Sequence, residues 1–276
     1  MTDQQYWVRI EFTRADTARY FKTDCTMWDR DTVLRYEEWF DTQEGSFALH
    51  AEKRLLEYLV SGWPRRGHSF LEVGCGPGMI LEMMYETGFD VTGLDASPAM
   101  LAAARKRMGT RADLHVGNAE HLPFDDNQFD YVALLTVLEF VENPMQALEE
   151  AFRVAARGVV VTMLNKWSFY YLTHGIRCCG RHSGVLREAN WYTPIRMRSM
   201  VRKAAGSKPF TMRSVLPGPF ITWKNTMPWR FVNSLLLPYG LGSYTGIRVD
   251  LCDIETVTPL MARTKAVVPP KPIASP

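Results

Sequence analysis

LEVGCGPG, residues 71–78, decides the fold of this 276-residue chain. The apolar residues before the glycines predict a strand. Gly74, Gly76 and Gly78 then allow the backbone to turn sharply and to approach a ligand with no Cβ in the way. A strand that runs into such a loop is typical of nucleotide-binding α/β proteins, and it predicts a ligand that contains a nucleoside.

This loop departs from the dinucleotide-binding fingerprint in two ways. Its third glycine follows Pro77 one residue earlier than in the spacing G-x-G-x-x-G, which seats a pyrophosphate on a helix N-terminus. Glu72 also places a carboxylate beside the loop, where it would repel two phosphates. The same carboxylate suits a ligand that bears an ammonium and a sulfonium, as S-adenosylmethionine does.

The next segment, FDVTGLDASPAML at residues 89–101, predicts a second strand that ends in Asp95 and a helix that begins near Pro98. An acid at the tip of the second strand, about 20 residues beyond the glycines, is placed to accept hydrogen bonds from both ribose hydroxyls. The alternative is that Asp95 caps the following helix, a role that Ser97 would serve better.

Strand and helix patterns alternate through the middle of the chain. The predicted strands are Phe70 to Val73, Val91 to Leu94, Leu114 to Gly117, Tyr131 to Leu135, Val159 to Leu164, Phe210 to Leu216 and Tyr244 to Leu251. The alternation favours a Rossmann-like α/β fold, in which a mostly parallel seven-stranded sheet carries helices on both faces. Ligands of such sheets bind at the carboxyl ends of the strands.

The length of the chain is that of one α/β domain with extensions. We expect residues 1–268 to form a single domain, followed by a flexible tail at 269–276. Within the domain, residues 1–68 form an N-terminal helical cap, 69–164 the cofactor-binding core, and 165–268 a substrate-side insertion after the fifth strand together with the last strands.

Four successive motifs resemble those of the class I S-adenosylmethionine-dependent methyltransferases, in the small-molecule branch called type 11. They are LEVGCGPG, GLDASPAML, GNAEHLPFDDNQFDYV and LLTVLEFVENPMQALEEAFRVAARGVVVTML. The resemblance runs from about residue 69 to 164. It implies S-adenosyl-L-methionine as cofactor and a methyltransferase activity, but it does not select an acceptor, since that branch methylates quinones, lipids, sterols, amines and thiols.

The resemblance also implies roles for individual residues. Glu72 would hold the ammonium of the cofactor, Asp95 the ribose, and Ala96 would pack near the adenine. Asn118 stands where the family usually has an aspartate that meets the adenine amino group, and its carbonyl oxygen can still accept that hydrogen bond. The implied cofactor-binding residues are Glu72, Gly74, Cys75, Gly76, Gly78, Asp95, Ala96, Asn118, Ala119, Leu135, Thr136, Tyr20 and Trp39.

The segment before the first strand predicts two helices separated near Gly45. In the family, this part closes over the methionine end of the cofactor. Tyr20, Tyr36, Trp39 and Phe40 are therefore candidates for a lid. The alternative for each of these rings is ordinary core packing of an amphipathic helix.

The catalytic residues are not fixed by the sequence. Many relatives have a histidine pair after the fourth strand, where this chain has Leu138, Glu139 and Phe140. If the acceptor must lose a proton, His174, His182 and Tyr171 are the candidates for a base.

The insertion after the fifth strand is rich in aromatic residues, which would shape an acceptor pocket or simply pack in the core. The candidates for the pocket are Trp167, Tyr170, Tyr171, His174, Trp191, Tyr192 and Trp223. Apolar side chains in segments 167–172 and 227–239 favour a hydrophobic acceptor such as a quinone-like ring or a lipid. The alternative is that they cover the far edge of the sheet.

The composition bounds the remaining properties. A formal net charge of +2 argues against a nucleic-acid partner held by many phosphates. The five cysteines lack the spacing of a metal site, although the adjacent pair Cys178 and Cys179 leaves a thiolate role open. The N-terminus has no signal-peptide pattern, and the longest apolar run holds about half of the ~20 residues of a membrane span. We therefore expect a cytoplasmic protein that acts on a small molecule.

The sequence predicts a methyltransferase that moves a methyl group from S-adenosylmethionine to a small or lipophilic acceptor. Two alternatives are a non-catalytic S-adenosylmethionine-binding module and an NAD-dependent oxidoreductase. The intact glycine loop with Asp95 disfavours the first, and the early third glycine with Glu72 disfavours the second.

Overall fold

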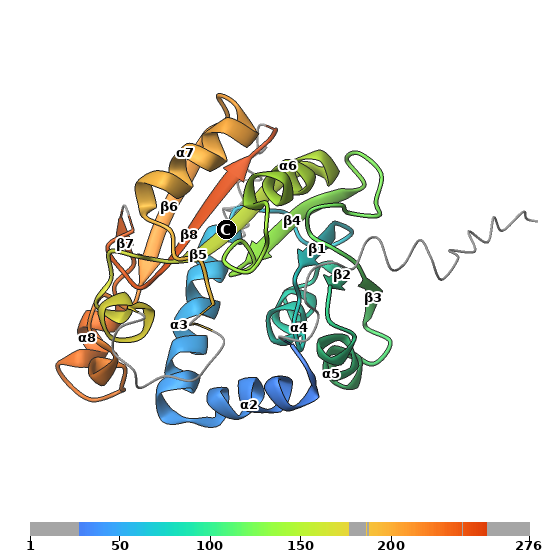
Figure 1. The fold of residues 1–276 in the computed structure, drawn as a ribbon. Coiled ribbons are helices and arrows are strands. Elements are labelled where there is room, and N and C mark those ends of the chain that lie inside the picture. Colours follow the sequence, from blue (N-terminus) through green and yellow to red (C-terminus); the bar gives the residue numbers. More distant parts are fainter. Residues whose placement is uncertain (1–27, 177–185, 187, 239, 253–276) are drawn as a thin grey trace, which may run out of the picture.

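The computed structural model describes residues 28–176, 186, 188–238 and 240–252, which form one mixed sheet with helices on both faces (Figure 1). The strands are β1 (Ser69–Val73), β2 (Asp90–Asp95), β3 (Ala112–Val116), β4 (Phe129–Leu135), β5 (Ala155–Leu164), β6 (Phe210–Val215), β7 (Leu237–Pro238) and β8 (Tyr244–Asp250). The α-helices are α2 (Arg30–Asp41), α3 (Gln43–Val60), α4 (Met79–Glu86), α5 (Pro98–Met108), α6 (Pro144–Val154), α7 (Pro194–Ala205) and α8 (Trp229–Ser234). Two short helices, η1 (Tyr171–Gly175) and η4 (Phe220–Thr222), lie in the insertion.

The strand order is β3-β2-β1-β4-β5-β8-β6-β7. The first five strands pair in parallel, whereas β8, β6 and β7 are antiparallel to their neighbours. The order reverses between β1 and β4, so the loops after these two strands diverge to opposite sides. In a sheet of this kind, the crevice at that point is the usual ligand site.

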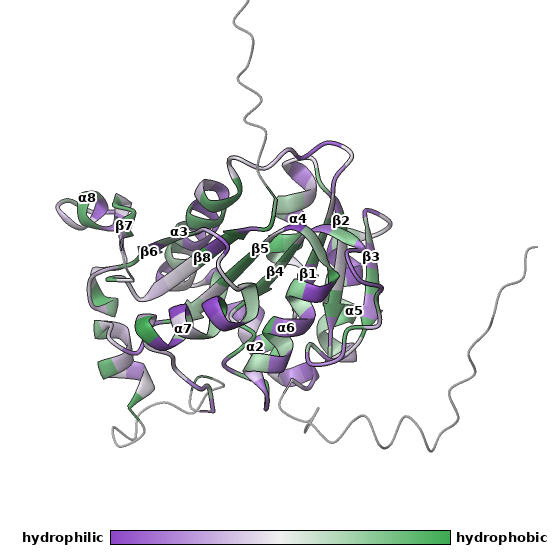
Figure 2. Cartoon of the chain, turned by 90° about the horizontal axis from the view of Figure 1, so that it is seen from above, coloured by the Kyte–Doolittle hydropathy of each residue, from purple (hydrophilic) through white to green (hydrophobic). Residues whose placement is uncertain are grey.

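Two apolar cores lie on the two faces of the sheet. The first contains side chains of α3 and α4, such as Leu55 and Leu81, and the second contains those of α6 and α7, such as Leu148 and Met197. Figure 2 shows the strands between α3 and α4 on one side and α6 and α7 on the other. The central strands are buried on both faces, which explains their nearly continuous apolar sequences.

The seven predicted strands are all present. In six of them, both the first and the last residue lie within two residues of the predicted bounds. The fifth begins four residues earlier, at Ala155, because a register shift lets Ala155 pair with Phe129. An eighth, two-residue strand, β7, was not predicted, since Leu237 and Pro238 carry no strand pattern. The helix break lies at Thr42 rather than near Gly45, because the Thr42 side chain caps α3 by accepting a hydrogen bond from Gly45 N.

Candidate functional site

The loop after β1 turns against the end of β2. The backbone N–H groups of Gly74 and Cys75 both donate to Leu94 O, at 2.6 and 3.0 Å. Gly74, Gly76 and Gly78 have φ values of 70°, 52° and 81°, which lie in the left-handed region that favours glycine. The spacing of the three glycines therefore reflects the backbone path of this turn.

The three glycines meet different surroundings. A Cβ on Gly74 would lie 2.4 Å from Val137 Cγ2, and one on Gly78 would lie 3.4 Å from the Cβ of Ala104 on α5. Among the described residues, a Cβ on Gly76 would find only Met100 Sδ within 4 Å, at 3.9 Å. Gly74 and Gly78 thus permit close packing, whereas Gly76 borders open space into which a ligand can come.

Asp95, the last residue of β2, holds this loop in place. Its Oδ2 accepts a hydrogen bond from Gly76 N and its Oδ1 accepts one from Ser97 N, both at 2.8 Å. Burial raises the pKa of the carboxyl, and the two N–H donors oppose that rise. Each oxygen keeps a second lone pair for a ligand hydroxyl. Ser97 caps α5 by accepting from Met100 N, so the capping alternative for Asp95 is wrong.

Glu72 lies on β1 and is 3% exposed. Its Oε2 has no hydrogen-bond partner among the described residues. Burial, and then the nearby charge of Asp95, hold the pKa of Glu72 well above its usual range. Buried polar atoms in proteins are almost always paired. The arrangement therefore fits a ligand that brings a positively charged donor to this oxygen.

The predicted adenine side lies after β3. Asn118 Oδ1 accepts a hydrogen bond from Glu120 N at 2.9 Å, which fixes the turn and leaves one lone pair on that oxygen. Ala119 is buried in the second core, and Ala96 directly follows Asp95.

Leu135 ends β4, as predicted, and Thr136 directly follows it. Thr136 has a φ of 56°, an uncommon value for a residue other than glycine, and its N–H donates to Thr162 Oγ1 at 3.1 Å. Thr162 Oγ1 also hydrogen-bonds the hydroxyl of Tyr244 at 2.7 Å. The pKa of Tyr244 is raised by burial and lowered in part by hydrogen bonds to Thr162 and Thr136. The buried phenol of Tyr244, which the sequence analysis did not identify, therefore lies beside the end of β4.

Aromatic rings cover this end of the sheet, as the lid prediction requires. In Figure 1, α2 runs along the bottom of the molecule between α3 and α5. Trp28 packs edge to face on Tyr36 at 5.5 Å and on Phe140, after β4, at 5.7 Å. The pKa of Tyr36 is raised by burial and by the charges of Glu52, Glu72 and Asp95, the last two of which border the glycine loop.

The remaining lid candidates differ. Phe40 packs edge to face on Tyr36 at 5.0 Å, and Trp39 packs on Phe40 and against the first core. Tyr20 lies outside the described residues. Trp28 was missed by the sequence, because it precedes the predicted helix and has no periodic pattern.

Glu52 is a second residue that the sequence reading missed. Leu59 and Leu55 of α3 contact Gly246 of β8, so the preceding turn of the helix brings Glu52 towards Tyr244. Glu52 has no hydrogen-bond partner among the described residues, and burial raises its pKa to about 8. Its charge in turn raises the pKa of Tyr36, Tyr170 and Tyr244. The sequence signal that could have identified Glu52 is an acidic residue on the apolar side of a predicted helix.

Glu139, which occupies the position of the histidine pair of relatives, is fully buried. Its Oε1 accepts a hydrogen bond from Leu164 N at 2.7 Å, and its carbonyl oxygen accepts one from Asn190 N at 2.8 Å. Burial raises the pKa of Glu139 to about 8. These contacts join the loop after β4 to the end of β5 and to the segment before α7, which is a structural role.

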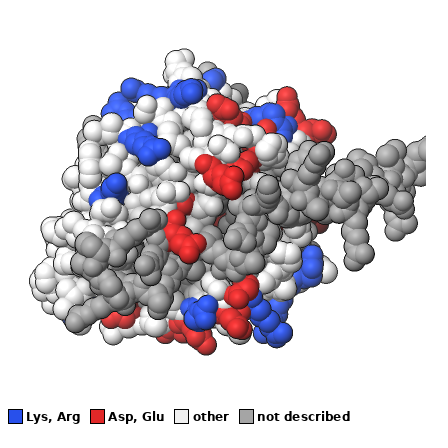
Figure 3. Space-filling view, viewed as in Figure 1, with Lys and Arg blue, Asp and Glu red and all other residues white. Residues whose placement is uncertain are grey.

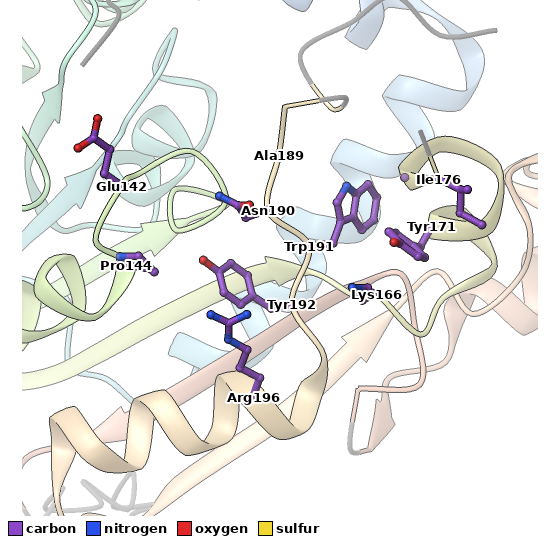
Figure 4. Close-up of a pocket in the computed structure, with 11 residues that line it drawn as sticks. Glu142, Pro144, Lys166, Tyr171, Ile176, Ala189, Asn190, Trp191, Tyr192 and Arg196 are labelled. Atoms are coloured by element: carbon purple, nitrogen blue, oxygen red, sulfur yellow. The ribbon is translucent and has the colours of Figure 1, made fainter. Parts of the chain in front are cut away.

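A pocket of about 530 Å³ lies on the insertion side of this loop (Figure 4). Three of the predicted acceptor-side residues line it, namely Tyr171, Trp191 and Tyr192. Lys166 lies over the ring of Tyr171 and Arg196 over that of Tyr192, at 5.7 and 5.4 Å from the ring centroids. The pocket thus combines aromatic walls with two cations.

The other predicted acceptor-side residues lie elsewhere. Tyr170 and Trp223 are buried in the first core, and His174 stacks on Tyr170 at 4.5 Å. The side chain of Trp167 is 62% exposed. Tyr170 and Trp223 therefore pack in the core, which was the alternative to lining the acceptor pocket.

Among the described residues, no group of three or more His, Cys, Asp or Glu side chains is arranged to hold a metal ion. His182, Cys178 and Cys179 lie outside these residues. No described helix combines the length and the apolar character that crossing a membrane requires.

The chain is similar in sequence to known proteins over up to about half of its length. Residues 71–163 match the family pattern described as a methyltransferase domain. An uncharacterized protein of Methanocaldococcus jannaschii is 36% identical over 137 residues, which are 49% of this chain and 60% of that protein. The demethylmenaquinone methyltransferase of Listeria monocytogenes is 40% identical over 122 residues, 41% of this chain and 50% of that enzyme. The chain thus spans only about half to three fifths of these relatives.

The fold is also that of solved structures. A protein of Thermotoga maritima, described as an S-adenosylmethionine-dependent methyltransferase and possible histamine N-methyltransferase, superposes with a TM-score of 0.65. The match covers 81% of this chain and 98% of that protein at 24% identity, and at that identity it shows the fold alone.

Proposed function

We propose that residues 71–163, which match the methyltransferase-domain family, form a class I methyltransferase domain of the type 11 branch, and that the protein transfers a methyl group from S-adenosylmethionine to a small lipophilic acceptor. The observation that carries the proposal is the buried Glu72 carboxyl, which has an oxygen without a partner among the described residues and feels the charge of Asp95, the acceptor of Gly76 N. The ammonium of S-adenosylmethionine would supply that partner. A pyrophosphate would instead be repelled by Glu72 and Asp95.

When bound, S-adenosylmethionine supplies a methyl group that its sulfonium charge already activates. Asp95 would accept the ribose hydroxyls with the lone pairs that Gly76 N and Ser97 N leave free. Thr136 lies at the end of β4, where the family places residues beside the transferable methyl. The protein's main contribution is then alignment, which is worth roughly 7 to 11 kcal/mol in well-oriented reactions. Trp28 and Tyr36 would exclude water from this end of the sheet.

The acceptor would approach from the insertion, residues 165–268. Tyr171, Trp191 and Tyr192 give the pocket there its aromatic walls, which suits a ring-containing or lipophilic molecule. One relative is named for a methylation of demethylmenaquinone, and a quinone-like ring is accordingly the acceptor that we would test first.

Calorimetric titration with S-adenosylmethionine, its demethylated product and NAD tests the proposal. We expect the product to bind more tightly than about 100 μM, which corresponds to about −5.5 kcal/mol. Binding of NAD alone would favour an oxidoreductase. Product binding without methyl transfer to any metabolite in a screen with labelled cofactor would favour a non-catalytic binding module.

Glu52 is the group best placed to take a proton from the acceptor. It has no partner of its own among the described residues, and its charge raises the pKa of Tyr36, Tyr170 and Tyr244. His174, by contrast, stacks on Tyr170, and Tyr171 lines the pocket in contact with Lys166. We propose Glu52 as the base in place of these two.

The substitution Glu52→Gln is expected to lower kcat by about 10²- to 10³-fold, the usual contribution of a positioned base. Because the pKa of Glu52 is raised to about 8, the carboxyl is protonated below that pH and accepts a proton only above it. The wild-type rate should therefore rise with pH through about 8, and the variant should lose this rise. The measurement is a pH profile of kcat with the acceptor found in the screen.

Glu57→Gln, an exposed position on the same helix, is the matched control and should keep both the rate and the profile. Affinity for the demethylated product should be the same in all three proteins. An unchanged pH profile in Glu52→Gln would rule Glu52 out as the base.

A further inference from the structure

The charges of this chain are divided very unevenly. Residues 165–249, which we call the C-terminal layer, contain thirteen Lys and Arg and a single acid, Glu188. The net charge of this layer is +12, while the whole chain has only +2, which leaves −10 for the remainder. The chain as a whole is therefore nearly neutral, although its C-terminal layer is strongly basic.

The cations of the C-terminal layer are not neutralised within the described part of the protein. Ten of them are described, and only Arg248 forms an ion pair, with Asp250 at 2.8 Å. Arg196, Arg198, Arg202 and Lys203 follow one another along α7 and are exposed. In the rest of the described chain, four arginines are paired with acids, namely Arg107, Arg111, Arg153 and Arg157.

The same layer exposes large apolar side chains. Ten of the fourteen exposed large hydrophobic residues in the described protein belong to it. The most exposed on its helices and turns include Trp167, Phe169, Ile221, Met227, Phe231 and Leu241, all more than half exposed. Soluble proteins rarely gather so many in one region unless they bind an apolar partner.

These apolar residues gather at one end of the molecule, because short contacts tie their segments together. Asn165 Nδ2 donates to the carbonyl oxygens of Gly240 and Gly242, which brings Trp167 towards Leu241. The ring of Tyr170 lies 4.8 Å from that of Trp223, beside η4.

Helix α8 joins the same group, since Asn233 Nδ2 donates to Thr222 O at 2.8 Å. Figures 1 and 2 both place α8 and β7 at the end of the sheet that is farthest from β3. In Figure 3, Lys and Arg side chains lie over α7 at the upper left, and the described atoms at the lower left, around α8, are mostly uncharged.

Cations beside exposed aromatic and aliphatic side chains match one kind of partner. A nucleic acid would use the cations but would leave Ile221, Met227 and Phe231 in water. The headgroup region of an anionic bilayer takes both, since apolar side chains enter the acyl boundary while Lys and Arg remain among the phosphates.

We propose that the C-terminal layer docks on the surface of an anionic lipid bilayer, with Ile221, Phe231 and their exposed neighbours entering the interface. The layer begins at Asn165, directly after β5, and Lys166 and Tyr171 line the 530 Å³ pocket. Docking would thus hold the pocket near the lipid. That a lipophilic acceptor is taken up from the bilayer rests on the proposed function, whereas docking itself does not.

The test is sedimentation of the full chain with vesicles of phosphatidylcholine alone and of phosphatidylcholine with phosphatidylglycerol in equal parts. We expect binding to the anionic vesicles that is at least tenfold tighter than to the neutral ones and that weakens as salt is raised. The double variant Ile221→Ser/Phe231→Ser should weaken binding at least tenfold. Lys224→Glu/Arg230→Glu should do the same.

Matched controls come from the other side of the protein. Leu34→Ser/Val116→Ser changes two other exposed apolar residues, and Arg105→Glu/Lys106→Glu changes an exposed basic pair on α5. Both should bind vesicles like the wild type. Calorimetric affinity for the demethylated cofactor should be unchanged in all four variants, which verifies that they are folded.

Three results would overturn the proposal. The first is the absence of binding to either kind of vesicle. The second is tighter binding to duplex DNA or RNA oligonucleotides that the apolar variants do not alter. The third is a dimer seen by light scattering without vesicles and lost in Ile221→Ser/Phe231→Ser. Because no cofactor is present in the vesicle assay, failure of docking and failure of the methyltransferase proposal are seen separately.

Discussion

Gly76→Val is expected to yield a folded protein that no longer binds S-adenosylmethionine or its demethylated product. Among the described residues, a Cβ at this position would meet only Met100 Sδ, at 3.9 Å, so the branched side chain has room beside them. That room is the space from which the ligand would approach the loop. We expect calorimetric affinity to fall at least 100-fold, about 2.7 kcal/mol, with little change in circular dichroism.

The control for this prediction is Gly109→Val. Gly109 has a φ of 58°, close to the 52° of Gly76, and its Cβ would also find open space, but it lies after the far end of α5. Both variants therefore place a β-branched side chain at a positive φ. Only Gly76→Val should lose the ligand. Full affinity in Gly76→Val would mean that the loop is a turn and not a binding surface.

Asp95→Ala is expected to weaken cofactor binding by about 2 to 3 kcal/mol, or roughly 30- to 150-fold. Two losses contribute. The ribose hydroxyls lose a charged acceptor, and the N–H groups of Gly76 and Ser97 lose the oxygens that fix the loop. The second loss should also lower the free energy of unfolding by about 1 to 2 kcal/mol. Titration and denaturant unfolding measure the two effects.

Asp90→Ala is the matched control, since Asp90 begins the same strand, is exposed and lies at the opposite end from the loop. It should change neither affinity nor stability by more than about 0.5 kcal/mol. If Asp95→Ala were destabilised but bound the cofactor with unchanged affinity, Asp95 would be a loop clamp only, and the ribose assignment would be wrong.

The sequence determined the strands, the turn and the strand-end acid of this protein, which depend on residues that are close in sequence. Apolar runs such as Leu71 to Val73 predicted the strands, and the spacing of Gly74, Gly76 and Gly78 predicted the turn that their positive φ values show. Asp95 was placed at the end of the second strand for the same reason. Each of these features is encoded within about 25 residues, and the chain topology of the fold then brings them together at one edge of the sheet.

Local patterns were least reliable where a residue's surroundings come from distant segments. Glu139 occupies the place of a base in relatives, but contacts with Leu164 N and Asn190 N bury it as a structural link. Trp223 was a candidate for a pocket wall and is instead part of the core. In both cases the side chain alone is compatible with either role, and only its neighbours decide.

Only the tertiary structure decided which side chains stand over the glycine loop and which surface remains uncovered. Glu52 faces Tyr170 and Tyr244, which lie more than a hundred residues away in sequence, and Trp28 meets Phe140 across the end of the sheet. The exposed aromatic residues of the C-terminal layer are of the same types as the buried ones. Whether a side chain is buried depends on the residues that pack against it. The periodicity of one segment does not predict which distant segment will cover it.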